Sequence, residues 1–134
     1  MEYFRAMQPD SDDRPLVGRS GRTLGVRVPQ DIGPDQAAMV HPAQGGMSVA
    51  PETLWNVPNH RRPRGLGSGS TGPLGDRIYA IDTRAIQERG LAARPDPAAP
   101  NRHAFVEPSK SMSLDRYERA LVSTRPSWQH AWPR

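Results

Sequence analysis

The alternation of apolar and polar positions along the chain predicts short β-strands separated by long loops. Side chains of a strand point to opposite faces in turn, so a half-buried strand alternates at period 2. Five segments have this alternation or the β-rich composition of strands: 2–7, 23–29, 47–50, 77–82 and 101–108. Polar stretches rich in Pro and Gly separate them, including a Pro-rich connector expected at 91–100.

Two segments carry helix signals. The first, 83–89, begins with the capping candidates Asp82 and Thr83 and ends at Gly90. The second, 114–123, follows a serine that can cap it, and its apolar residues recur at helical spacing. Several short strands with few helices are typical of the α+β class, so we predict a compact α+β fold with long loops.

The length of 134 residues predicts a single domain over 1–134. The 15 prolines and 12 glycines favour extensive loops. A basic and then glycine-rich segment at about 59–75 includes a G-x-G-x-x-G pattern at 67–72. No strand is expected before this pattern and no helix after it, so we predict a flexible loop there and not a dinucleotide-binding turn.

The charge balance permits an anionic partner. All but one of the 18 basic residues are arginine, and the formal net charge is +4. The planar guanidinium suits phosphate and carboxylate groups, which points to a nucleotide, RNA or an acidic protein. The alternative explanation is a GC-rich genome, which favours arginine codons whatever the function.

Several classes of site and location are excluded or disfavoured. The chain has no cysteine, and its four histidines show no metal-ligand spacing, so no metal is expected. No apolar run is long enough for a signal peptide core or a membrane span. We therefore expect no membrane association, and a protein that is cytoplasmic or delivered into a target cell without a signal peptide.

Three polar residues on predicted strands are the candidates for chemistry. Arg5 is flanked by large apolar residues in the first strand, where it either meets an anion or faces water from an edge strand. Ser48 follows paired glycines at the start of a middle strand. Glu107 ends a late strand, as either a solvated surface acid or a catalytic carboxylate.

Arg5, Ser48 and Glu107 in this order resemble the Arg-Ser-Glu pattern of the ADP-ribosyltransferase fold. The chain is similar in particular to small bacterial toxins of that fold that type VI and related secretion systems deliver. The motifs that carry the resemblance are Tyr3-Phe4-Arg5-Ala6, Gly45-Gly46-Met47-Ser48-Val49, and His103 to Pro108 followed by a helix and Trp128.

The resemblance implies an enzyme that uses NAD as substrate. Arg5 is then expected to bind a phosphate or ribose of NAD, and Ser48 to support the nicotinamide ribose. Tyr3 and His103 are the other expected cofactor-binding residues. Glu107 is expected to accept a hydrogen bond from the ribose 2′-hydroxyl and to stabilise positive charge as nicotinamide leaves.

Other activities of the same superfamily stay open. Phe105 stands two residues before Glu107, where enzymes that modify protein side chains have Glu or Gln, so transfer to arginine is not expected. Water can be the acceptor, which makes the protein an NAD glycohydrolase. The segment 78–91 resembles the strand–helix unit of RNA 2′-phosphotransferases, in which the chemistry falls to arginine and histidine, here Arg5, Arg102 and His103.

Two hypotheses in which the protein is not an enzyme also stay open. The first is a basic RNA-binding protein that uses 60–64. The second is an interaction module that a partner orders, which the low aliphatic content allows. For the toxin, the target protein or nucleic acid is unknown, and an immunity or antitoxin protein is an expected partner.

Overall fold

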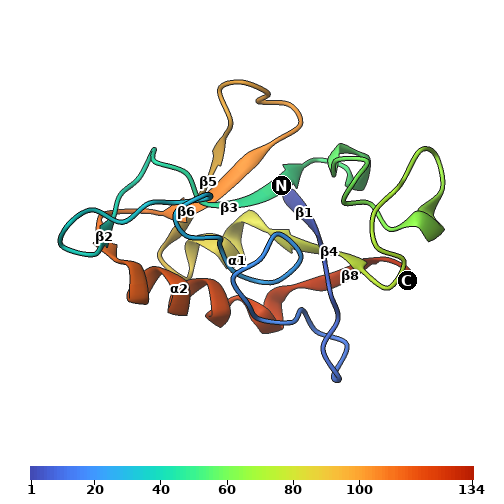
Figure 1. Ribbon diagram of the computed structural model, residues 1–134, viewed down its shortest axis with the longest axis horizontal. Helices are drawn as coiled ribbons and strands as arrows, with labels where there is room; N and C mark the ends of the chain where they lie inside the picture. The colour runs from blue at the N-terminus through green and yellow to red at the C-terminus, as the bar shows by residue number, and fades with distance from the viewer.

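A computed structural model describes residues 1–134, and its centre is one six-stranded antiparallel sheet (Figure 1). The strand order is β5-β6-β3-β1-β4-β8. The strands are β1 Glu2–Met7, β3 Met47–Pro51, β4 Arg77–Asp82, β5 Leu91–Pro95, β6 Ala104–Pro108 and β8 Gln129–Trp132. A separate two-stranded ladder joins β2 Met39–Val40 to β7 Met112–Ser113. Helices are α1 Thr83–Gln87 and α2 Leu114–Ser123, with 3-10 turns η1 Leu54–Asn56, η2 Arg64–Leu66 and η3 Arg125–Ser127.

Both faces of the central strand β1 are buried, which explains its content of large apolar residues. Tyr3 and Met7 lie in the larger core cluster, and Phe4 and Ala6 lie in a smaller one on the opposite face. The larger cluster also takes in residues of both helices, whereas the smaller one packs against residues of η1, η2 and β8. Arg5 therefore stands on the helix-covered face of a strand that has neighbours on both sides.

The two helices begin where their capping residues predict. The Asp82 carboxylate accepts a hydrogen bond from the Arg84 N–H, and the Ser113 hydroxyl accepts one from the Arg116 N–H. Tyr117 of α2 is fully buried against the sheet, and its hydroxyl donates to the carbonyl of Val106 in β6. Burial raises the pKa of this tyrosine well above its usual range, so the hydroxyl keeps its proton.

The α+β class is confirmed, because the chain is 32% strand and 18% helix. Two local predictions are wrong. The segment 23–29 is not a strand, although Leu24 and Val26 are fully buried. The connector expected at 91–100 begins with β5, which pairs along its whole length with β6. No helix in this fold is both long and apolar enough to cross a membrane.

Candidate functional site

The site begins where β1 and β3 part. The two strands pair only between the start of β1 and the end of β3, where Phe4 lies opposite Ala50. On its other side β1 pairs with β4 over all six residues. On the side away from β1, β3 stays paired with β6, with Ser48 opposite Phe105. The carbonyl of Ser48 that faces β1 therefore lacks a strand partner, and the Arg5 side chain fills the opening.

Arg5 is held by backbone carbonyls and by no acidic side chain. Its Nη1 donates to Ser48 O at 2.7 Å, its Nε to Thr23 O at 3.1 Å and its Nη2 to Thr23 O at 2.9 Å. Longer bonds run from Nη2 to the carbonyls of Ser20 and Gly25. Desolvation lowers the pKa of Arg5 to about 10, so the buried guanidinium stays charged at neutral pH. The alternative of an edge strand with Arg5 in water is wrong.

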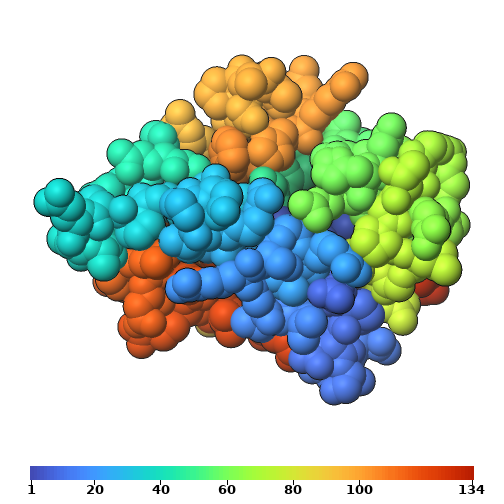
Figure 2. Space-filling model, viewed as in Figure 1, coloured from blue at the N-terminus to red at the C-terminus, as the bar shows by residue number.

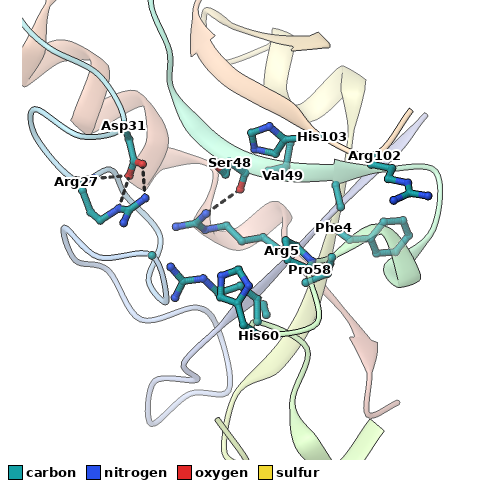
Figure 3. A pocket seen from close by; sticks show the side chains of 15 residues that line it. Phe4, Arg5, Arg27, Asp31, Ser48, Val49, Pro58, His60, Arg102 and His103 are labelled. Carbon is teal, nitrogen blue, oxygen red and sulfur yellow. Dashed lines mark hydrogen bonds and ion pairs between the residues drawn. The ribbon is translucent and has the colours of Figure 1, made fainter. Parts of the chain in front are cut away.

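A cleft of about 180 Å³ opens at this point (Figure 3). Five stretches of chain supply its walls: the two parted strands β1 and β3, the loop that follows β1, the turn after η1, and the end of the β5–β6 hairpin loop. The lining residues are Phe4, Arg5, Ala6, Gly21, Arg27, Asp31, Ser48, Val49, Ala50, Val57, Pro58, His60, Arg61, Arg102 and His103. The space-filling view shows this hollow between the blue and green segments, below the orange hairpin (Figure 2).

The cleft carries an excess of positive charge. Arg27 is neutralised by Asp31, whose carboxylate accepts from its Nη2 at 2.8 Å and from its Nε at 3.2 Å. The guanidinium groups of Arg61 and Arg102, which also line the cleft, make no hydrogen bond or ion pair with the protein. Arg61 lies close enough to Arg5 to lower the pKa of that residue. Such a cleft suits an anionic ligand with more than one phosphate.

Ser48 and His103 present polar atoms to the cleft. The Ser48 hydroxyl has no hydrogen-bond partner in the protein, because only its carbonyl is used by Arg5. His103 immediately precedes β6, and its side chain is 29% exposed. Its Nδ1 is bonded to Asp96 at 2.8 Å, and its ring meets Phe105 edge-to-face. Arg5, Ser48 and His103, distant in sequence, thus come together.

Tyr3 and Glu107 do not line the cleft. Tyr3 is buried in the larger core cluster. Glu107 is also buried, and its Oε2 accepts the backbone N–H of Ala43 at 2.8 Å. It lies on the same face of β6 as Phe105, the partner of Ser48, so it stands one step along the strand from the cleft wall.

Comparison with known proteins identifies no relative. No protein family matches the sequence, and no curated protein or solved structure is detectably similar to the chain.

The basic segment 60–64 is not one surface patch. Arg62 is buried, and its guanidinium donates to the Ser70 hydroxyl and to the carbonyls of Trp55, Val57 and Ser68. These bonds give the glycine-rich segment after it a defined conformation; its flexibility in solution stays a prediction. The neighbours of Arg62 have different surroundings, since Arg61 lines the cleft and Arg64 is exposed on η2. The segment does not offer RNA a continuous row of guanidinium groups.

Sequence reasoning missed two features of the site. The sequence pattern groups Arg61 with its neighbours as a basic segment. Only the turn after η1 directs its side chain into the cleft. Asp96 lay in a stretch predicted as a connector, where no cross-strand partner could be assigned. Recognition of β5 as a strand would have signalled that Asp96 faces His103 across a hairpin. No group of three or more metal-ligating side chains is assembled anywhere in the molecule.

Proposed function

We propose that the protein is an NAD-dependent ADP-ribosyltransferase that binds NAD in this cleft and acts as a toxin on an intracellular target. One observation carries the proposal: Arg5, Ser48 and His103 line a single cleft that also holds two arginines without acidic partners. NAD has two phosphates and two riboses. The cleft offers cationic and hydroxyl groups that match both.

The unpaired arginines are assigned to the pyrophosphate. Arg61 and Arg102 line the cleft from different segments, so they can contact the two phosphates from different sides. Arg5 spends most of its N–H groups on carbonyls, which leaves it one N–H of Nη1 for a ligand. Its main contributions are a fixed positive charge and a rigid cleft wall.

Ser48 and Glu107 are assigned to the nicotinamide ribose. The Ser48 hydroxyl is free to bond a ribose oxygen. The Glu107 carboxylate acts on the 2′-hydroxyl and stabilises the positive charge that develops as nicotinamide leaves. Glu107 is buried and its Oε2 accepts the Ala43 N–H, so the carboxylate must either give up this bond or use Oε1 to reach a ribose.

The proposal predicts release of nicotinamide from NAD by the purified protein, in the presence of a bacterial lysate. NAD labelled in its adenylate half distinguishes the products, since transfer places the label on a macromolecule and hydrolysis leaves it in free ADP-ribose. Expression of the protein inside bacteria is expected to arrest growth. A purified, folded protein that leaves NAD intact under all these conditions would refute the proposal.

A second candidate is an RNA 2′-phosphotransferase, favoured by the identity of the residues that reach the cleft. Arg5, Arg102 and His103 all line it, whereas Glu107 does not. That activity also consumes NAD, but it requires an RNA that bears a 2′-phosphate. Loss of that phosphate on incubation with NAD, together with an unreactive NAD in its absence, would favour this candidate.

A further inference from the structure

His103 is fixed by contacts on two sides. Its Nδ1 lies 2.8 Å from Asp96 Oδ2, and its ring packs edge-to-face on Phe105 with 4.7 Å between ring centroids. Asp96 is itself fixed, because its Oδ1 accepts the Ala98 N–H and its backbone N–H donates to the carbonyl of His103. The imidazole therefore has one orientation relative to the cleft.

The hydrogen bond to Asp96 determines which ring nitrogen is free. The bond from His103 holds the pKa of Asp96 below its usual value, so Asp96 is an ionised carboxylate that only accepts. Nδ1 must then carry the proton, and Nε2 carries the lone pair. Nε2 has no hydrogen-bond partner in the protein, and His103 lines the cleft.

No other group in the cleft is so placed to accept a proton. Asp31 is bonded to Arg27, the hydroxyl of Ser48 is not basic at neutral pH, and His60 is exposed with no residue to orient it. The remaining charged groups that face this space are the guanidinium groups of Arg5, Arg27, Arg61 and Arg102. Asp96 is the acid bonded to the ring of His103.

We propose that Asp96 and His103 form a base dyad in which Nε2 of His103 deprotonates the acceptor of the ADP-ribosyl group, and that this acceptor is a hydroxyl. The inference rests on the proposed function. The bond between ribose C1′ and the nicotinamide nitrogen breaks, and nicotinamide leaves with the electron pair. The acceptor O–H gives its proton to Nε2 as its oxygen bonds to C1′. Asp96 is a positioning residue that stabilises the resulting imidazolium.

The variant Asp96→Asn tests the dyad and can keep the turn that Asp96 forms with the Ala98 N–H. Its side-chain oxygen can keep the Ala98 N–H, which leaves the amide NH2 to face His103 Nδ1. Nδ1 must then accept, and the ring proton moves to Nε2. We expect nicotinamide release, measured with NAD and water as the acceptor, to fall about a hundredfold in kcat with little change in KM.

The chain contains a matched control outside the cleft. Asp35 bonds His41 at the same 2.8 Å and also accepts backbone N–H groups through its Oδ1. The variant Asp35→Asn is expected to keep wild-type kcat and pH dependence. A third variant, His103→Gln, removes the proposed base. Its rate of nicotinamide release is therefore expected to vary less with pH than that of the wild type.

Nitrogen NMR of the imidazole rings gives a readout that does not require turnover. We expect the proton on Nδ1 of His103 in the wild type and on Nε2 in Asp96→Asn. A wild-type proton on Nε2, or turnover by Asp96→Asn within twofold of the wild type, would overturn the dyad while the proposed function stands. Absence of nicotinamide release from the wild type would refute the proposed function itself.

Discussion

Replacement of Arg5 by alanine is expected to lower the free energy of unfolding by about 4 kcal/mol, because it strands buried carbonyls. The carbonyls of Ser48 and Thr23 lose their closest donors, and those of Ser20 and Gly25 lose weaker ones. Each buried acceptor without a partner costs about 1–3 kcal/mol. Urea-induced unfolding at neutral pH measures the difference.

Two other variants separate the effect of the hydrogen bonds from that of charge. Arg5→Lys keeps a cation but loses the planar fork, so we expect an intermediate loss of stability. Arg27→Ala removes an arginine of the same cleft whose side chain is 46% exposed, and Asp31 keeps its bond to the backbone N–H of residue 27, so it should cost less stability than Arg5→Ala. An Arg5→Ala protein as stable as Arg27→Ala would contradict the structural role given to Arg5.

The Glu107→Gln variant is expected to lose at least a hundredfold in the rate of nicotinamide release while it stays folded. The glutamine oxygen can still accept the Ala43 N–H, so the buried contact survives. The variant removes the negative charge proposed to stabilise the positive charge that develops on the ribose as nicotinamide leaves, and groups of this kind contribute about 10²–10³-fold to rates. The measurement is kcat for NAD beside the melting temperature.

A matched acid on α2 provides the control for this variant. Glu118 forms a surface salt bridge with Arg19, away from the cleft, and Glu118→Gln should leave the rate unchanged. Equal NAD turnover by Glu107→Gln and the wild type would remove Glu107 from the mechanism. Nicotinamide release that requires an RNA with a 2′-phosphate, and that Glu107→Gln leaves unchanged, would favour the chemistry of RNA 2′-phosphotransferases.

The regular elements that the sequence predicted are those whose signals are local. β1 and β4 are short runs with strand-forming aromatic or β-branched residues, and Asp82 and Ser113 cap their helices through bonds that span two or three residues. The prediction of a strand at 23–29 was wrong because a distant side chain uses carbonyls of this segment. Thr23 and Gly25 accept hydrogen bonds from Arg5, so the apolar residues of this segment are buried in an irregular loop and not in a strand.

The site was predictable only as far as strand positions determine it. Ser48 and His103 reach the same cleft as Arg5 because β6, β3 and β1 are adjacent in the sheet. Arg61 and Asp96 depend on how a turn and a hairpin loop fold back, and no periodicity in the sequence records that. Residues of this kind add to the positive charge of the cleft, as Arg61 does, or orient a lining side chain, as Asp96 orients His103.

Calorimetric titration with NAD measures directly whether the cleft is an NAD site. We predict that the wild type binds NAD and that a double variant, Arg61→Ala with Arg102→Ala, binds at least tenfold more weakly with a smaller dependence on salt. Both arginines lack partners in the protein, so the double variant should stay folded. Failure of the wild type to bind NAD, or equal affinity of the two proteins, would contradict the account.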